Sequence, residues 1–211
     1  MANDMTTAHG WAMGGEIGIS KEDGPVTASA SYGLGWSVLK QDPYTNSLGT
    51  TTYDANWTDW DQRNTFKLSL TSTWLGDGKN SIWKAKRHNF FFRSTLQVNF
   101  NSGLPYTGYE GYTATHLIGQ GDEGVSAAPE NQQVLQGYMN GERKSNYFRA
   151  DLTVFDVGRS GRWRTYFTII NITDHANVYT VNYDTKENPP KKEVTHQFPF
   201  LPLFLGAEVE F

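Results

Sequence analysis

Strict alternation of apolar and polar residues is the clearest pattern in this chain. Between residues 26 and 38 the even positions carry Val, Ala, Tyr, Leu or Trp, and the odd positions carry Thr, Ser or Gly, without exception. Successive side chains of a strand point to opposite faces, so this segment predicts a strand with one apolar and one polar face. It is longer than a usual strand of about 5–6 residues. A strand that crosses a bilayer needs about 9–11 tilted residues, which this length provides.

Further segments repeat the alternation and predict an all-β chain. The predicted strands are 11–20, 26–38, 65–74, 90–101, 148–154, 163–170 (prolonged by 178–183) and 201–211. Between residues 90 and 101 an apolar face opposes one that carries Arg93, Gln97 and Asn99. Charged and amide side chains at every second position are unsuited to the core of a sandwich, but they suit the wet interior of a membrane barrel.

The connections between these strands alternate between short and long. Residues 41–61, 102–146 and 184–199 are predicted as long polar loops, and the other connections are shorter. Outer-membrane barrels have short periplasmic turns and longer outer loops. With the long loops outside, seven strands would start at the outer face, whereas bacterial single-chain barrels have an even strand number. We therefore predict an antiparallel transmembrane β-barrel segment of about seven strands, part of a larger barrel, over residues 11–211, after a leading loop or disordered start at residues 1–10.

Composition limits the other classes. The 211 residues carry a net charge of −4, which argues against a nucleic-acid partner because such proteins usually show a basic stripe. The chain contains no run of about 18 apolar residues, so the sequence predicts no transmembrane helix. The absence of cysteine excludes disulfides and cysteine-based metal sites. Residues 1–10 lack the basic and apolar regions of a signal peptide.

Five short motifs occur in an order that resembles the C-terminal barrel of TonB-dependent outer-membrane receptors. They are Asp61-Gln62-Arg63-Asn64, Ser102-Gly103-Leu104-Pro105-Tyr106-Thr107, Arg149-Ala150-Asp151-Leu152-Thr153-Val154, Ile170-Asn171-Ile172-Thr173-Asp174 with Asn177-Val178-Tyr179, and Leu201-Pro202 up to Phe211. The resemblance covers nearly the whole chain from about Trp11.

The resemblance implies a place in the bacterial outer membrane and a role in energy-coupled uptake of a scarce nutrient, such as an iron chelate or an oligosaccharide. It implies outer-membrane lipid and the TonB system as partners, the latter through a plug domain that this sequence lacks together with the early strands. A surface lipoprotein or other subunits of a complex are further partners to consider. Phe211, Val209 and Leu205 resemble the terminal signal that the barrel-insertion machinery reads.

Catalytic and metal-binding chemistry finds little support. Gly119 to Gly124 has the spacing of a dinucleotide-binding glycine motif, but Asp122 and Glu123 would repel a pyrophosphate. The five histidines show no ligand spacing, and no calcium-loop template fits Asp122, Glu123 and Glu130. No nucleophile elbow is present. We predict no enzyme, no cofactor and no metal site.

Two sets of residues are candidates for function. The polar positions that would face the lumen are Lys67, Arg93, Arg149, Asp151, Arg164 and Glu208. The aromatic and histidine candidates for ligand binding in the outer loops are Trp57, Trp60, Tyr109, Tyr112 and His116. Exposed aromatic residues often mark recognition surfaces, although loops that pack on one another would use the same residues. Trp74, Trp83, Trp163 and Phe90 fall near strand ends and suit an interfacial aromatic girdle.

A second interpretation stays open from the sequence alone. A soluble β-sandwich or a small self-contained barrel, acting as a binding or structural module, would also produce strands with one apolar face. The two interpretations differ in what covers that face: lipid in the first, and a second protein layer in the other.

Overall fold

The computed structural model of the chain describes residues 8–41, 44–45, 51–52, 55–76, 81–84, 90–114, 132–136, 139–158, 163–184, 191–197 and 202–209. Over these residues the fold is all-β and is built from antiparallel ladders, apart from one short parallel pair. None of the described residues belongs to a helix with the length and apolar character needed to cross a membrane.

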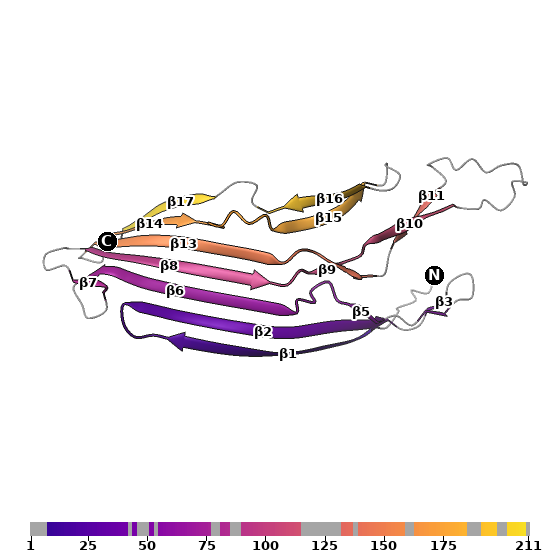
Figure 1. The fold of residues 1–211 in the computed structure, drawn as a ribbon, viewed down its shortest axis with the longest axis horizontal. Coiled ribbons are helices and arrows are strands. Elements are labelled where there is room, and N and C mark those ends of the chain that lie inside the picture. Colours follow the sequence, from indigo (N-terminus) through magenta and orange to yellow (C-terminus); the bar gives the residue numbers. More distant parts are fainter. Residues whose placement is uncertain are drawn as a thin grey trace, which may run out of the picture.

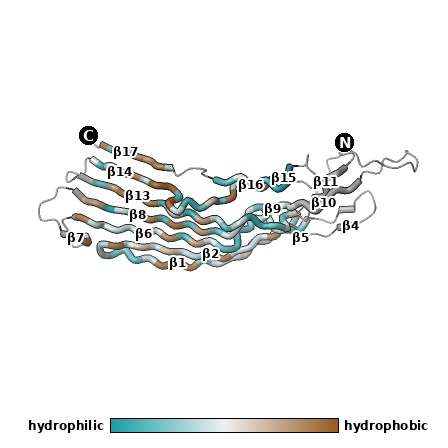
Figure 2. Tube along the Cα trace, turned by 45° about the horizontal axis from the view of Figure 1, so that its top comes forward, coloured by the Kyte–Doolittle hydropathy of each residue, from teal (hydrophilic) through white to brown (hydrophobic). Residues whose placement is uncertain are grey.

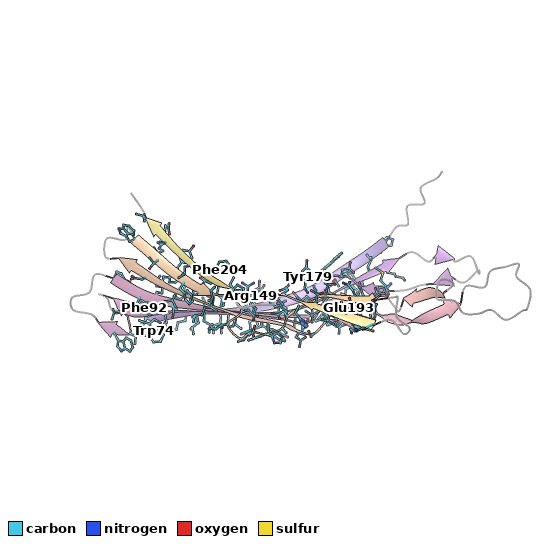
Figure 3. The ribbon with its side chains drawn as sticks, turned by 90° about the horizontal axis from the view of Figure 1, so that it is seen from above. Trp74, Phe92, Arg149, Tyr179, Glu193 and Phe204 are labelled. Atoms are coloured by element: carbon cyan, nitrogen blue, oxygen red, sulfur yellow. The ribbon has the colours of Figure 1, made fainter. Side chains whose placement is uncertain are left out.

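Seven long strands form one sheet in which each strand pairs with its neighbours along the chain (Figure 1). In sheet order these are β1 (Ala8–Lys21), β2 (Val26–Gln41), β6 (Asn64–Gly76), β8 (Phe90–Asn101), β13 (Tyr147–Gly158), β14 (Trp163–Ile169) and β17 (Leu203–Val209). The seven strands predicted from the alternation are thus confirmed, with β1 beginning at Ala8 rather than Trp11. Viewed from above, the sheet is curved and its side chains leave on both sides (Figure 3).

The strands pair in a register that places the residues of one face of each strand beside those of the same face of its neighbours. One row of facing residues runs Ile17, Tyr32, Phe66, Phe100, Phe148, and a second runs Ala28, Leu70, Leu96, Leu152, Ile169, Leu203. On the other face a row runs Thr27, Thr71, Thr95, Thr153, Thr168. The sheet therefore has one largely apolar face and one largely polar face, although Phe204 lies opposite Thr168, and Tyr166 opposite Gly206, on the polar face.

The described residues leave the apolar face of the sheet uncovered. Ile19 in β1 and Leu205 in β17 are 75% and 83% exposed, and Met13, Trp163 and Leu203 are also exposed. Among the described residues, few apolar side chains are buried: Val38 and Ala150, with Pro105 and Pro202. A soluble domain is stabilised by burying its apolar side chains, and the described part of this sheet buries very few.

The two ends of the sheet differ in their connections. At the short-connection end lie the described residues 22–25 and 81–84, which include β7 (Trp83–Lys84), and β7 runs parallel to the end of β6. At the long-connection end lie the described parts of the connections between β2 and β6, between β8 and β13, and between β14 and β17 (Figure 1). The alternation of short and long connections expected from the sequence is present.

The long connections contain strands that the sequence did not predict. They hold β3 (Tyr44–Thr45), β4 (Thr51–Thr52), β5 (Ala55–Trp57), β9 (Pro105–Tyr106), β10 (Tyr109–Ala114), β11 (Gln132–Gln136), β12 (Glu142–Arg143), β15 (Val178–Asp184) and β16 (Lys191–His196). β5 pairs with β2, and the others form two-stranded sheets: β3 with β4, β9 with β12, β10 with β11, and β15 with β16.

Two boundary predictions are therefore wrong. Residues 178–183 do not prolong the preceding strand, because Asn171 and Asp174 adopt positive φ angles of 55° and 51° that break it, and β15 pairs with β16 instead. Residues 184–199 are not a plain loop, since they contain β16. The last strand is described from Leu203 to Val209, so Leu201, Glu210 and Phe211 lie outside the described residues.

β1 and β17 are the edges of the main sheet, and no pairing joins them among the described residues. The structure therefore shows an open antiparallel sheet. Among the described residues this sheet does not close into a barrel.

Candidate functional site: a polar assembly at the long-connection end

Asp61 is the centre of a buried polar cluster at the long-connection end. Its residue is 1% exposed, and its Oδ1 accepts a hydrogen bond of 2.7 Å from the Ser37 backbone N–H. The same edge of β2 is held by the Thr58 and Ser37 hydroxyls, which share a hydrogen bond, and by the Gly35 N–H, which donates to the Arg63 carbonyl at 2.9 Å. A side-chain carboxylate thus takes the place of a strand carbonyl between β5 and β6.

Two arginines neutralise this carboxylate. Arg143 binds Asp61 Oδ2 and also donates to the carbonyls of Asp61 (2.9 Å) and Gly103 (3.1 Å). Arg63 Nε lies 3.5 Å from the same Oδ2, and its guanidinium lies 4.3 Å from the centroid of the Trp57 ring. A buried carboxylate is tolerated only with such partners. The cluster therefore connects residues 57–63 to Gly103 and Arg143.

Backbone packing around the cluster requires glycine and asparagine at two positions. A Cβ on Gly103 would overlap the Lys144 carbonyl, which explains a residue without a side chain there. Asn140, buried and with a φ of 57°, donates from Nδ2 to the Trp57 carbonyl at 2.6 Å and to Asp59 Oδ1 at 2.7 Å. Asparagine tolerates the left-handed region better than most residues, because its amide bonds locally.

A second polar cluster joins β13 to the break after β14. Asp151, which pairs with Arg149, accepts a hydrogen bond of 2.9 Å from the Asn171 N–H. Asn177 is fully buried: its Oδ1 accepts from the Phe148 N–H at 2.8 Å, and its Nδ2 donates to the Phe148 carbonyl at 2.7 Å. One side-chain amide therefore satisfies both backbone groups of Phe148, which pairs with Phe100 of β8 on one side and lies beyond the end of β14 on the other.

A third contact, between exposed side chains, links β9, β12 and β16. The Tyr106 hydroxyl donates to Glu142 Oε2, Lys192 Nζ donates to the Tyr106 oxygen at 2.5 Å, and Lys192 lies 3.7 Å from Glu142 Oε2. Partial burial and the Glu142 hydrogen bond raise the pKa of Tyr106, while Lys192 opposes them. The hydrogen bond to Tyr106 raises the pKa of Lys192.

The six residues predicted to face a lumen share the polar face of the sheet. Register places Lys67 opposite Ser31 and Asn99, and Arg149 opposite Asn99. Arg93 donates to Thr73 at 3.3 Å, Arg149 pairs with Asp151, and Arg164 pairs with Glu208 at 3.2 Å. Lys67 lines a hollow of about 350 Å³ with serine and amide side chains. The six predicted residues therefore lie on one face of the sheet.

Two of the loop residues predicted to bind ligand, Trp57 and Trp60, have described side chains, and both line a small hollow of about 50 Å³ with Met139 and Asn140. Trp57 packs under Arg63, which makes it part of the buried cluster. Trp60 is 70% exposed and lines a groove of about 340 Å³ that also includes Met13, Trp36 and Gln62. Tyr109 and Tyr112 lie on β10, but their side chains are outside the description, and His116 lies outside the described residues.

The aromatic and terminal residues lie mainly on the apolar face. Trp74 donates from Nε1 to Ser94 at 2.7 Å, and its ring centroid lies 6.1 Å from that of Trp83 at the short-connection end. Trp163 lies opposite Val209, and Phe167 opposite Leu205. The side chain of Phe90 and the whole of Phe211 lie outside the description, so an insertion signal at the terminus stays a prediction.

Several residues of these clusters were missed from the sequence. Glu142 and Lys192 lie in stretches that resemble solvated loops, and only pairing of the long connections brings them together. Asn140 and Arg143 were missed for the same reason, because their partners Asp59 and Asp61 are far away in the sequence. Within the described residues, no group of three His, Asp or Glu side chains is arranged to hold a metal ion. The described clusters thus offer structural contacts between connections.

Comparisons of this chain with models of protein families, with curated proteins and with solved structures found no match.

Proposed function

We propose that this chain supplies C-terminal wall strands of a TonB-dependent receptor in the bacterial outer membrane, which takes up a scarce nutrient such as an iron chelate or an oligosaccharide. The observation that carries the proposal is the apolar face, which extends over seven paired strands and which the described part of the chain leaves uncovered. In water such a face would be unfavourable, at roughly 25 cal/mol for each Å² of apolar surface. Lipid removes that cost.

The lengths of the five longest strands, β1, β2, β6, β8 and β13, support a bilayer as the missing layer, whereas β14 and β17 are shorter. On β2 the alternation runs from Val26 to Val38, and at about 3.3 Å per residue it extends roughly 40 Å. A tilt of about 45° reduces this to nearly 30 Å, which is the hydrocarbon thickness of a bilayer. Apolar residues alternate with polar ones along the strands of the main sheet, whereas β15 and β16 are mainly hydrophilic (Figure 2).

The polar face supports a wet interior on the other side. It carries threonine rows whose hydroxyls share hydrogen bonds, 2.9 Å between Thr71 and Thr95 and 3.0 Å between Thr153 and Thr168. It also carries the charged pairs Arg149–Asp151 and Arg164–Glu208. Barrel strands with lipid outside and water inside have this arrangement.

The motifs that resemble the receptor family now have a physical role. Asp61 and Arg63 of the first motif meet Gly103 of the second around Arg143. Arg149 and Asp151 of the third motif meet Asn171 of the fourth. Residues that are scattered in sequence therefore form the two clusters from which the long connections start, which favours a shared architecture over chance similarity of short motifs.

Arginine substitutions on the two faces test the proposal. Leu68→Arg places a charge on the apolar face and is expected to cost about 2–4 kcal/mol in the free energy of unfolding from lipid, as an arginine at the bilayer midplane does. Thr71→Arg, on the polar face of the same strand, should cost much less. Urea unfolding of both variants from lipid vesicles gives the two values, and equal costs would refute a lipid-facing surface.

The solubility of the purified protein separates this proposal from a soluble binding module. We expect aggregation in the absence of detergent, because the apolar face and the β1 and β17 edges are both uncovered in the described structure. A monodisperse, detergent-free monomer in analytical ultracentrifugation would support the soluble module instead.

A further inference from the structure

The dipeptide Glu142-Arg143 lies where the three long connections meet. β12 pairs with β9 in a register that places Glu142 opposite Tyr106 and Arg143 opposite Pro105. Adjacent residues of a strand point to opposite sides. Arg143 accordingly reaches Asp61 in the first long connection, while Glu142 reaches Lys192 in the third. A two-residue strand in the second connection therefore contacts both of the others.

The two contacts made by β12 differ in burial. The Asp61 side chain is 0% exposed where it meets Arg143, so that contact is part of the interior. The side chains of Glu142 and Lys192 are each 47% exposed. Exposed ion pairs contribute little and exchange readily with water, whereas a buried charge cannot lose its partner without a large cost. One side of β12 is thus fixed and the other can open.

The hairpin formed by β15 and β16 depends on the exposed side. Its strands pair only with each other among the described residues, and all six residues of β16 are exposed. An isolated two-stranded hairpin is marginally stable in water. Its base is closed by the Gln197 N–H, which donates to the Asn177 carbonyl at 2.7 Å. The hairpin is joined to the rest through the Asn177 side chain, which binds Phe148, and along its length by Lys192 and by Lys144, whose Nζ donates to the Tyr179 carbonyl at 2.8 Å.

We propose that the β15–β16 hairpin is a hinged flap, held closed on β9 and β12 by Tyr106, Glu142 and Lys192 and pivoting at the buried Asn177. Asn177 stays in place when the flap opens, because its amide is bound to both backbone groups of Phe148 in β13. Opening uncovers the Tyr106 ring, over which the Lys192 ammonium lies at 5.1 Å. The inference concerns motion within the long-connection end and holds whether or not the proposed transport function is correct.

Hydrogen exchange of the detergent-solubilised protein tests the flap. Tyr106→Phe keeps the ring but loses the hydroxyl, and Glu142→Gln and Lys192→Met each remove one charge. In each variant the amides of residues 178–184 and 191–196 should exchange about three- to fivefold faster, the size expected for losing one exposed charged contact. Lys191→Met, on the neighbouring residue of β16, is the matched control and should leave these rates unchanged.

The distribution of faster-exchanging amides over the hairpin and β13 decides whether the proposal holds. The double variant Glu142→Gln/Lys192→Met should exchange hardly faster than either single variant, because both remove the same contact. The amides of β13 around Phe148 should keep wild-type rates in all variants. Unchanged hairpin rates in all three single variants would overturn the proposal. Equal acceleration in β13 would also overturn it, since the contact would then support the whole fold.

Discussion

The main sheet and the long-connection end are stabilised by different interactions. In the sheet, seven strands are held by backbone ladders, and large apolar side chains such as Ile19 and Leu205 remain exposed. At the long-connection end, the most buried side chains are polar: Asp61, Asn171 and Asn177. A soluble domain has the reverse distribution, with apolar side chains inside and polar ones outside.

The two regions therefore differ in the kind of side chain that each buries. The described polar groups of the long-connection end mostly bond to one another, but Arg63 Nε and Asn171 Oδ1 are buried without a hydrogen-bond partner. Buried polar networks are costly when one member is missing, but they specify a unique arrangement when complete. The described contacts of the long connections thus depend on polar partners rather than on apolar burial.

Removing Arg143 should produce the largest loss of stability at the long-connection end. Arg143→Met leaves the buried Asp61 carboxylate with one described cation, Arg63 at 3.5 Å, beside the Ser37 N–H, and should cost about 3 kcal/mol in the free energy of unfolding. Arg164→Met breaks the exposed pair with Glu208 on the sheet and should cost about 0–1 kcal/mol. Urea denaturation measures both. Similar losses would erase the distinction between the two regions.

Removing the Asn177 amide tests the second cluster. In Asn177→Ala the N–H and carbonyl of Phe148 lose their partners in a buried place, at an expected cost of about 2–3 kcal/mol. Asn182 is exposed on β15, so Asn182→Ala should change stability by less than about 0.5 kcal/mol. Thermal unfolding followed by circular dichroism compares them. An Asn177→Ala protein as stable as Asn182→Ala would mean that water replaces the amide.

Within the sheet, close packing at Gly206 should matter more than charge. A Cβ on Gly206 would overlap the Tyr166 ring, which lies across the glycine of the facing strand. Gly206→Ala should therefore cost about 1–3 kcal/mol, the usual effect of overpacking. The same change in a Tyr166→Ser background should cost much less, and a double-mutant cycle measures the coupling. Independent effects would show that the ring moves aside freely.

The strands of the sheet were predictable because their pattern is local. Alternation over residues 26–38 determines both the strand and its two faces, and the neighbouring strands follow along the chain, so register adds little that the pattern lacks. The exception is the end of β14, where Asn171 turns into the left-handed region and the following apolar residues enter another strand. The alternation of apolar and polar residues does not reveal such a break in a strand.

The contacts of the long-connection end were not predictable in the same way. Asp61 meets Arg143 across 82 residues of sequence, and Tyr106 meets Lys192 across 86. No spacing rule links such residues, and a charged residue in a polar loop is ordinarily solvated. The motifs pointed to Asp61, Gly103 and Asn171 through resemblance alone, and their physical role as partners of one another required the structure.

The smallest expected effect, and the sharpest in sign, concerns the Tyr106 phenol. Burial and the Glu142 carboxylate raise its pKa from 10.0, whereas Lys192 lowers it; Tyr183 on β15 is the other titratable group that acts on Lys192. Glu142→Gln should therefore move the pKa of Tyr106 down, and Lys192→Met should move it up. Because the folded-state pKa values of Tyr106 and Lys192 are both raised, the contact is complete below about pH 10 and is lost as pH rises through those values. Absorbance titration at alkaline pH, taken as the difference from Tyr106→Phe, isolates this tyrosine. Shifts of the same sign in both variants would mean that the three side chains do not meet in solution, and the polar contacts of the long-connection end would then be limited to its buried part.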